Sequence, residues 1–210
     1  MSLIQLRNIK KKFKDKIIFD NFSLDIDKGD FVVIIGKSGS GKSTLLNLLG
    51  LLDSPDSGSV TIANETNVSP FSTKAQKLLQ HQIGYLFQNF ALIDDKTVLA
   101  NLKIAFTTKP KDYLKIIDET LTRVGLINFQ PKLVYQCSGG EQQRIALARL
   151  IIKNSNIILC DEPTGSLDAE NKEMVIKLLK ELNNEGKTLI IVTHDNDFLQ
   201  YADKVVNLNN

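Results

Sequence analysis

Residues 36–43 constrain the fold of this chain more than any other segment. They read Gly-Lys-Ser-Gly-Ser-Gly-Lys-Ser and follow a continuous apolar run, Phe31–Ile35, which is typical of a strand buried on both faces of a sheet. A helix is predicted directly afterwards. Glycines let a backbone wrap closely around phosphate oxygens, and the start of a helix turns its positive dipole end toward the same anion. This order of strand, loop and helix predicts a P-loop in an α/β fold.

Two side chains of the loop carry the chemistry of phosphate binding. Lys42 is placed to reach the β- and γ-phosphates of a nucleotide, and the hydroxyl of Ser43 is placed to hold Mg²⁺. An ordinary Gly/Ser turn is the alternative, and the strand before and the helix after the loop argue against it. We therefore predict that the chain binds and hydrolyses ATP with Mg²⁺. The predicted nucleotide-binding positions of this segment are Gly36, Lys37, Ser38, Gly39, Ser40, Gly41, Lys42, Ser43 and Thr44.

A second segment offers the acids that such chemistry needs. Ile157–Cys160 is a buried apolar run that ends in Asp161 and Glu162. The end of a strand places Asp161 at the carboxyl edge of the sheet, near the P-loop, where it can hold Mg²⁺ directly or through water. Glu162 then points elsewhere and can polarise a water for in-line attack. A strand followed by a solvated acidic turn is the plainer interpretation, and the presence of a P-loop outweighs it.

Strands and helices alternate around these two segments. Strands are predicted at Leu3–Ile9, Ile17–Ile26, Phe31–Ile35, Ser59–Ile62, Ile83–Gln88, Ile157–Cys160, Thr188–Thr193 and Val205–Leu208. Helices are predicted at Ser43–Leu52, Val98–Phe106, Tyr113–Val124, Gly139–Ile152, Ala169–Asn183 and Asn196–Tyr201. The pattern predicts an α/β P-loop NTPase core with a mainly parallel sheet, N-terminal antiparallel strands and an inserted α-helical subdomain.

Composition narrows the possible partners. The chain has 210 residues and a net charge of +2, too weak a bias to indicate nucleic acid as a partner. No stretch approaches about 18 continuous apolar residues, so we expect no membrane span. The N-terminus lacks the apolar core of a signal peptide, and two distant cysteines, Cys137 and Cys160, fit a reducing cytoplasm. Because the chain stops at Asn210, soon after His194, we expect no appended regulatory domain.

Four further segments give the sequence its family resemblance. A helix is expected to open with Ser138-Gly139-Gly140, followed by Glu-Gln-Gln-Arg. After the acidic pair, the chain continues as Pro-Thr-Gly-Ser-Leu to Asp168. A buried strand closes with Thr-His-Asp, and the strand before the helical insert ends with Gln88. Together these segments resemble the nucleotide-binding domain of ATP-binding cassette (ABC) transporters over essentially the whole chain. The resemblance implies a single ABC ATPase domain over residues 1–210, in which residues 1–88 and about 153–210 form the ATP-binding core and about 89–152 the helical signature subdomain.

The resemblance also implies a partner subunit. Two such domains, identical or different, pair head to tail in the presence of ATP and enclose two ATP molecules, each between the P-loop of one subunit and the Ser138-Gly139-Gly140 segment of the other. A serine and two glycines at a helix N-terminus form a second anion cradle, which is useful only if a phosphate arrives from outside. The plainer interpretation, a helix cap with glycine spacing, explains the helix start but not the double glycine. Glu141 and Asp168 are the other nucleotide-contacting residues implied, and Asp168 matches the aspartate that communicates across the dimer.

Several single positions match residues with known roles in the family. Phe13 matches the aromatic residue that stacks on adenine, with core packing as the alternative. Gln88 matches the glutamine that touches Mg²⁺ or the attacking water and senses the membrane partner. His194 matches the histidine that contacts the γ-phosphate. The implied catalytic residues are Glu162, His194, Lys42 and Gln88, and the implied metal ligands are Ser43, Gln88 and Asp161.

The sequence departs from the family pattern at two positions. Cys137 stands where leucine is usual, and as a small hydrophobe it can keep apolar packing with some lost volume. Glu141 stands where many relatives carry glutamine. The signature form and the residues after Gln88 look most like the subgroup that serves lipoprotein release, macrolide efflux and antimicrobial-peptide export.

The predicted function is an ATPase subunit that energises a separate integral membrane permease. We expect it in the cytoplasm, held at the inner face of the membrane by that permease, and exporting or extracting a peptide, lipid-linked or drug-like cargo. An importer ATPase is the alternative within the family. A soluble ABC ATPase without a transport role, a small-molecule P-loop kinase and a catalytically dead nucleotide-binding module are the alternatives outside transport. Intact Lys42, Asp161, Glu162 and His194 argue against the last of these.

Overall fold

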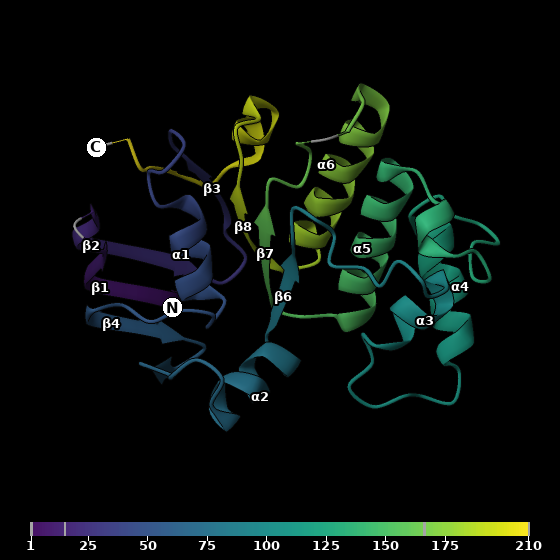
Figure 1. Ribbon diagram of the computed structural model, residues 1–210, viewed down its shortest axis with the longest axis horizontal. Helices are drawn as coiled ribbons and strands as arrows, with labels where there is room; N and C mark the ends of the chain where they lie inside the picture. The colour runs from purple at the N-terminus through teal and green to yellow at the C-terminus, as the bar shows by residue number, and fades with distance from the viewer. Residues whose placement is uncertain (1, 15, 166, 210) are drawn as a thin grey trace.

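Two β-sheets organise the fold, as Figure 1 shows. The computed structural model describes residues 2–14, 16–165 and 167–209. In this part of the chain, an antiparallel sheet has the strand order β2-β1-β4-β5 and a parallel sheet has the order β6-β7-β8-β3-β9. The strands are β1 (Ser2–Phe13), β2 (Lys16–Asp27), β3 (Phe31–Ile35), β4 (Ser57–Ile62), β5 (Glu65–Thr66), β6 (Ile83–Leu86), β7 (Ile157–Asp161), β8 (Thr188–Val192) and β9 (Lys204–Asn207). The predicted fold class is confirmed.

Helices fill the space between the sheets and cover the far face of the parallel sheet. The α-helices are α1 (Lys42–Leu49), α2 (Thr73–His81), α3 (Val98–Lys103), α4 (Tyr113–Arg123), α5 (Gly139–Lys153) and α6 (Ala169–Asn184), and short 3₁₀ helices lie at Val134–Gln136 and Asn196–Tyr201. None of the helices in the described ranges is both long and apolar enough to cross a membrane.

The parallel sheet is apolar on both faces, and each face belongs to a separate core. Along β3, Val32 and Ile34 pack with α1 and the antiparallel sheet, whereas Phe31 and Val33 pack with the helices of the other side. Side chains alternate between the faces of a strand, so a continuous apolar run is what a sheet covered on both sides requires. The result is a layered core in which α1 lies between the two sheets, as Figure 1 shows.

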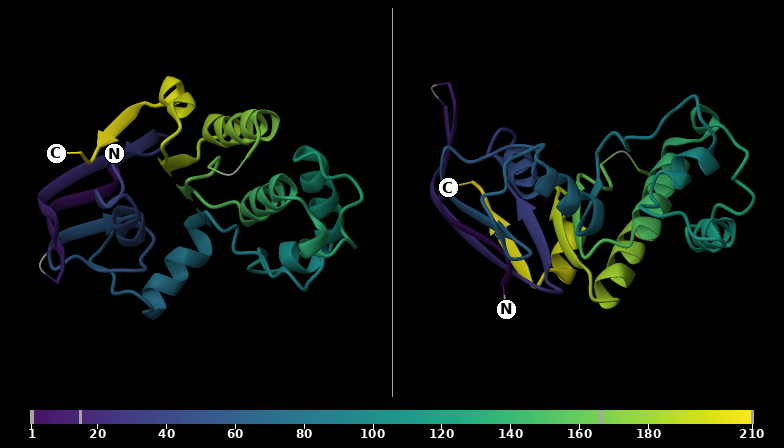
Figure 2. Two further views of the ribbon diagram at one scale, coloured as in Figure 1. Left: turned by 45° about the horizontal axis from the view of Figure 1, so that its top comes forward. Right: turned by 90° about the horizontal axis from the view of Figure 1, so that it is seen from below.

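The helical part lies away from the antiparallel sheet. In both views of Figure 2, α3 and α4 lie at the end opposite β1 and β2. They pack on α5, and apolar residues of α3, α4 and α5 share one buried cluster with the parallel sheet. The boundaries of the predicted subdomain, near residues 88–89 and 152–153, stay a prediction.

Register within the parallel sheet brings distant residues to one edge. Asp161 at the end of β7 is opposite Val192 of β8, and Ile34 of β3 is opposite the same Val192. The P-loop follows β3, Glu162 follows β7 and His194 follows β8 closely. All three segments therefore leave the sheet at its carboxyl edge, which is where ligands bind in open α/β sheets.

The structure differs from the prediction at several elements. Helix α2 was not predicted. It begins after Ser72, whose hydroxyl accepts the N–H of Ala75 at 3.2 Å. Only Ala75 and Leu78 of this helix are buried, so the apolar pattern in its sequence is weak. Helix α1 ends at Leu49 rather than residue 52 because Gly50 caps it. Strand β6 stops before Gln88, as described below. Ser166, part of the segment that resembles the family, lies outside the described residues.

Candidate functional site

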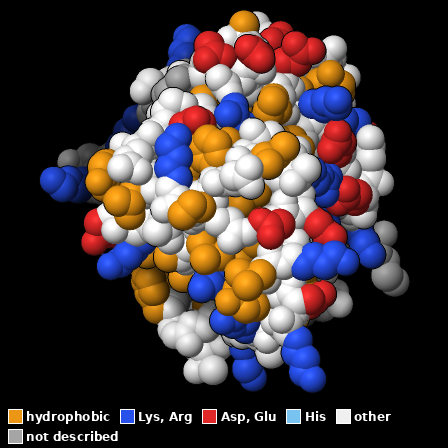
Figure 3. Space-filling view, turned by 90° about the vertical axis from the view of Figure 1, so that its right-hand side faces the viewer, with side chains coloured by type: hydrophobic (Ala, Val, Ile, Leu, Met, Phe, Trp, Pro, Cys, Tyr) orange, Lys and Arg blue, Asp and Glu red, His pale blue; other side chains and the backbone are white. Residues whose placement is uncertain are grey.

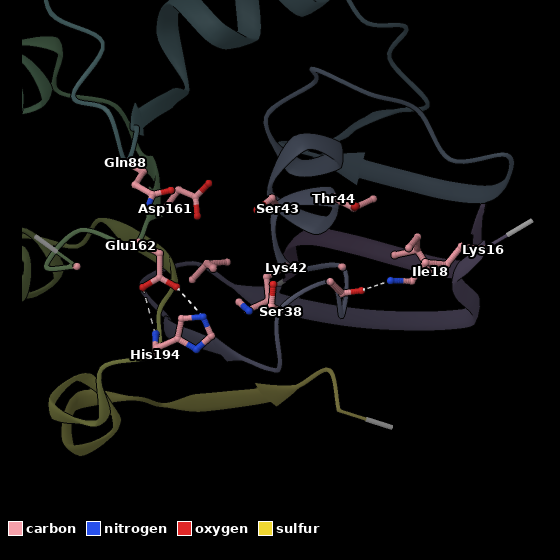
Figure 4. Close-up of a pocket in the computed structure, with 14 residues that line it drawn as sticks. Lys16, Ile18, Ser38, Lys42, Ser43, Thr44, Gln88, Asp161, Glu162 and His194 are labelled. Atoms are coloured by element: carbon pink, nitrogen blue, oxygen red, sulfur yellow. Dashed lines mark hydrogen bonds and ion pairs between the residues drawn. The ribbon is translucent and has the colours of Figure 1, made fainter. Parts of the chain in front are cut away.

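A pocket of about 580 Å³ lies between the P-loop and the ends of β7 and β8 (Figure 4). Its lining combines basic, acidic and hydroxyl side chains with loop backbone. The lining residues are Lys16, Ile18, Ser38, Gly39, Gly41, Lys42, Ser43, Thr44, Gln88, Asp161, Glu162, Gly165, Val192 and His194. The structure thus brings together the predicted catalytic residues Lys42, Gln88, Glu162 and His194, and all three predicted metal ligands, in one place.

The P-loop is a tightly wound backbone cradle. Gly39 and Gly41 have φ angles of 76° and 103°, which are strained for any residue with a Cβ. Lys42 begins α1, is 8% exposed, and donates from Nζ to the carbonyl of Gly36 at 2.6 Å and of Lys37 at 3.1 Å. The hydroxyl of Ser40 is buried and has no hydrogen-bond partner in the described structure. These features suit a loop built to close around an anion.

Gly36, Lys37 and Ser40 of the P-loop lie outside this lining. Gly36 is packed against its own loop, where a Cβ would meet Ser40 Oγ at 2.4 Å. Lys37 and Ser40 line a smaller recess of about 250 Å³ together with Asn209 and other residues. None of the three therefore forms the wall of the nucleotide pocket.

Replacing Gly41 by alanine is expected to reduce both stability and ATP affinity. The new Cβ would stand 2.6 Å from Ile18 Cγ2 and 3.0 Å from Phe19 Cζ, in addition to the strain of its φ angle. Gly186→Ala is the matched control, because Gly186 has a φ of 88° with nothing within 4 Å of its Cβ position. We expect the free energy of unfolding, measured with urea, to fall by about 1–2 kcal/mol in the control and by more in Gly41→Ala. Equal losses would contradict the steric part of this prediction.

Asp161 and Glu162 occupy the end of β7 as predicted. Burial and the neighbouring charge of Glu162 raise the pKa of Asp161, while Lys42 acts in the opposite direction. Glu162 has a φ of 46° and precedes a proline, a combination that the sterics of both residues disfavour. Its N–H donates to the carbonyl of Val192 at 2.9 Å, which fixes it beside β8. Such strain is stored at functional sites when neighbouring contacts hold it.

His194 holds the carboxylate of Glu162 at two points (Figure 4). Its backbone N–H donates to Oε2 at 3.2 Å, and its Nε2 lies 3.3 Å from Oε1. The side chain of His194 is 62% exposed, whereas that of Glu162 is 16% exposed. The imidazole therefore lies at the mouth of the pocket and the carboxylate deeper within it. This contact could not be inferred from the separate positions of the two residues in the sequence.

The residues predicted to hold Mg²⁺ fit that ion. Ser43, Gln88 and Asp161 all line the pocket and all offer oxygen atoms, the ligands that Mg²⁺ prefers. A cation here would also relieve the unfavourable closeness of two acids. The described residues contain no cluster of three or more acidic, histidine or cysteine ligands.

Gln88 requires a correction to its predicted place. Strand β6 ends at Leu86, and Gln88 lies exposed in the turn that follows. The next residues, Phe90 and Ala91, have φ angles of 62° and 47°, so the chain turns sharply away from the sheet. The apolar run in the sequence continues through Phe87 and concealed this turn.

The Ser138 segment does not line the nucleotide pocket. Ser138 caps α5 by accepting the N–H of Glu141 at 3.3 Å, and Glu141 accepts the N–H of Ser138 at 2.7 Å. Burial disfavours the charge on Glu141, but this N–H and the ammonium of Lys132 outweigh it and lower the pKa of Glu141. Ser138 and Gly139 are exposed, and a Cβ at Gly139 would meet nothing within 4 Å. Nothing in the described chain explains why residue 139 lacks a side chain.

Asp168 also lies outside the pocket, at the start of α6. Its carboxylate accepts the N–H of Asn171 at 2.9 Å and the side-chain amide of the same residue at 2.9 and 2.7 Å. These bonds lower the pKa of Asp168. Asn171 also accepts from Arg144 and lies against Gly140, where a Cβ would stand 2.7 Å from its Cγ. Asp168 and the Ser138 segment are thus joined into one surface through Asn171.

Phe13 is exposed, so core packing does not explain it. It ends β1, is 49% exposed, and carries the ammonium of Lys11 at 5.1 Å from its ring centroid. Its partner across the hairpin is Lys16, which lines the pocket and donates to the carbonyl of Gly39 at 2.9 Å. Lys16 and Ile18 were not predicted as site residues. The predicted strands, Leu3–Ile9 and Ile17–Ile26, stop short of this hairpin, whereas β1 extends to Phe13 and β2 begins at Lys16.

Fold and pocket together define a P-loop nucleotide-binding domain of the α/β class, and comparison with known proteins gives its family. A protein-family model described as "ABC transporter" matches residues 19–165. The chain belongs to the ABC transporter family. The predictions of the family and of an ATP-binding ATPase domain are confirmed.

Two curated relatives differ in how much of them this chain covers. The "Macrolide export ATP-binding/permease protein MacB" of Chlorobium luteolum is 41% identical over 189 residues, which are 89% of this chain but 28% of that protein. The "Probable amino-acid import ATP-binding protein YxeO" of Bacillus subtilis is 40% identical over 210 residues, which are 97% of this chain and 84% of that protein. The chain thus spans less than a third of the MacB relative.

Solved structures agree in fold. The "Dimeric Structure of MJ0796, a Bacterial ABC Transporter Cassette" superposes with a TM-score of 0.88 at 38% identity, covering 98% of this chain and 94% of that one. The same cassette in a "post-hydrolysis state" bound to "ADP and Pi" superposes with a TM-score of 0.87 at 37% identity, with the same coverage.

Proposed function

We propose that this domain is the motor of a transporter, in which two ATPase domains close head to tail on two MgATP and reopen after hydrolysis. One observation supports the proposal: two surfaces of the described chain are suited to hold an anion, and they do not meet. The P-loop pocket contains the proposed catalytic residues, whereas Ser138 and Gly139 lie exposed at the start of another helix. Each surface is half of a site, and a second domain supplies the other half.

Within one domain, the proposed roles follow from the pocket. The loop amides and Lys42 bind the β- and γ-phosphates, and the developing negative charge in the transition state falls within their reach. Ser43, Asp161 and Gln88 hold Mg²⁺, which supplies charge neutralisation when it is bound. Phe13 offers the exposed aromatic face on which adenine stacks.

Glu162 orients and activates the attacking water in this proposal. Its carboxylate lies within the pocket and its side chain is held by His194, so its position is fixed before substrate binds. His194 contacts the γ-phosphate from the mouth of the pocket. Preorganised geometry of this kind supplies much of the rate enhancement in phosphoryl transfer, because the reaction depends mainly on positioning and charge stabilisation.

The partner domain is proposed to bind the surface formed by Asp168 and the Ser138 segment, which Asn171 connects. The N-terminus of α5 presents the Ser138 hydroxyl and the first amides of a helix to an incoming phosphate. The open space at Gly139 leaves room for that phosphate to approach the backbone closely. Asp168, on the same surface, is placed to contact the partner.

A membrane permease is the second proposed partner, and we place it at a groove of about 440 Å³ beyond Gln88. The groove has apolar and aromatic walls with Arg149 and Lys153 among its lining residues. Arg149 donates to the carbonyls of Phe90 and Ala91 at 2.7 and 2.5 Å, so the groove and the turn after Gln88 share a contact. Movement of a permease segment in the groove can therefore reach the nucleotide pocket.

The helical end of the domain suits attachment to such a partner. Figure 3 views this end and shows hydrophobic side chains spread among charged ones. Large exposed hydrophobic residues of the helical part include Ile93, Ile104, Leu114, Ile127 and Tyr135. Exposed apolar groups of this kind are common at surfaces that another protein covers. We propose that the domain lies at the inner face of the membrane through this attachment.

Export is the proposed direction of transport. The signature form of this chain and its likeness to relatives named for macrolide export favour it. Import is the second candidate, because a relative named for amino-acid import is similar over nearly the whole chain. Two observations distinguish them. A co-purifying permease with a large external domain would support export, and a gene for an extracytoplasmic binding protein beside the gene for this chain would support import.

The purified chain is expected to release inorganic phosphate from ATP in a reaction that needs Mg²⁺ and no second substrate. Because two domains complete each site, turnover per chain should rise with protein concentration until the dimer is saturated. A phosphate-release assay over a dilution series measures both properties. Phosphate transfer to a small-molecule acceptor would instead indicate a kinase, and turnover per chain that is independent of concentration would contradict the need for a dimer.

A further inference from the structure

Helix α5 carries a buried polar side chain among apolar neighbours. Gln143 is 2% exposed, and Ile145, Ala146 and Leu147, which follow it closely, belong to the apolar core. Burying an amide is unfavourable unless it is hydrogen-bonded, so a helix with only a packing role would carry an apolar residue here. The Nε2 of Gln143 donates to the carbonyl of Pro163 at 2.7 Å.

The acceptor belongs to the turn that holds Glu162. The peptide between Glu162 and Pro163 follows a residue with a left-handed φ of 46°, which a proline successor makes still less favourable. Several hydrogen bonds hold this turn. The N–H of Glu162 donates to the carbonyl of Val192 at 2.9 Å, the N–H of Gly165 donates to the carbonyl of Glu162 at 3.2 Å, and the hydroxyl of Thr164 donates to Asp195 at 3.0 Å. Gln143 donates to the carbonyl of Pro163. Strained backbone persists only where surrounding contacts over-determine it.

We propose that Gln143 is a positioning residue for Glu162, holding the strained turn so that the carboxylate stays in its place in the pocket. The inference rests on the proposed role of Glu162 in activating water. Gln143 does not line the nucleotide pocket, so it acts through Pro163 rather than on the substrate. A misplacement of the order of 1 Å at a reacting group can lower a rate by about 10²-fold, so one such anchor is enough to matter.

The same helix begins at the surface proposed to meet the partner's phosphate. Ser138 caps α5, and Gln143 lies in its second turn. The helix whose N-terminus is proposed to meet the partner's phosphate therefore also carries the donor to the carbonyl of Pro163.

The test compares Gln143→Met with the unsubstituted domain in a steady-state ATPase assay. Methionine keeps the length and flexibility of the side chain and removes the donor. We expect kcat to fall roughly 10- to 100-fold, while KM for ATP and equilibrium ATP binding stay unchanged. Unchanged kcat in folded protein, or a parallel loss of ATP binding, would overturn the positioning role. If Gln143→Met does not fold, Gln143→Ala, which suits a helix, is judged by the same criteria.

Asn183→Leu is the matched control for stability. Asn183 is another buried amide, 9% exposed, which donates to the carbonyls of Gly29 at 2.7 Å and Lys187 at 3.1 Å. Both acceptors precede strands of the parallel sheet, so they lie at its amino edge, away from the pocket. We expect this variant to lower the melting temperature without changing kcat. A similar kcat loss in Asn183→Leu would show that Gln143 acts only through stability, and would overturn the proposal.

Glu162→Gln in the same assay separates the two hypotheses. If that variant keeps full turnover, the proposed function of Glu162 fails. If it loses turnover and Gln143→Met does not, only the positioning role fails. Adding Gln143→Met to Glu162→Gln should produce no further loss, because residues that act as a unit are non-additive.

Discussion

Glu162→Gln is expected to lower ATP turnover by roughly 10²- to 10⁴-fold and to leave ATP binding intact, because a glutamine keeps the shape of the side chain but cannot accept a proton. The bond from the backbone N–H of His194 to an Oε atom can persist with an amide oxygen, so the turn should keep its place. The variant should therefore bind MgATP, close with its partner and fail to reopen. Phosphate release measures the turnover, and sedimentation with ATP measures the trapped dimer.

A surface glutamate supplies the control for this substitution. Glu119 is 65% exposed on α4, and its contact with Lys115 at 3.7 Å is a surface ion pair. Glu119→Gln removes the same charge without touching the pocket, and we expect unchanged turnover. Turnover in Glu162→Gln that matched this control would remove Glu162 from the mechanism and direct the search for a base to other pocket residues.

The sequence predicts the nucleotide pocket well because the pocket depends on local rules. The glycines of a P-loop determine its backbone conformation locally. When a buried strand ends in acidic residues, those residues lie at the carboxyl edge of the parallel sheet. Lys42, Asp161 and Glu162 are therefore brought together by topology alone, and the structure has them in one pocket.

Other parts of the site could not be predicted, because they depend on where separate segments pack. Gln143 lies within a segment recognised for its resemblance, yet its bond to Pro163 spans 20 residues and has no periodic signal. The place of Lys16 beside Gly39 depends on pairing across a hairpin. Helix α2 buries only Ala75 and Leu78, too few apolar side chains to mark a helix in the sequence.

Mixing two inactive variants is expected to restore ATP hydrolysis if each site is shared between two domains. Lys42→Ala removes the ammonium that binds phosphate, and Ser138→Arg places a bulky side chain at the exposed start of α5, so neither homodimer contains a complete site. In a mixed dimer, the intact P-loop of the Ser138→Arg chain faces the intact Ser138 of the Lys42→Ala chain. One of its two sites is then complete. Random pairing at equal amounts would restore about a quarter of the sites of the unsubstituted protein.

The measurement is phosphate release by each variant alone and by their mixture, at a protein concentration that favours the dimer. Thr122→Arg provides the control for an added arginine, because Thr122 is exposed on α4 and its hydroxyl donates only locally, to the carbonyl of Asp118 at 2.8 Å. Full turnover in Ser138→Arg alone would contradict a catalytic contribution from the partner's helix. Activity that appears only in the mixture would instead mean that the exposed cradle at Ser138 and the P-loop of a second domain form one site, because neither variant chain carries both halves intact.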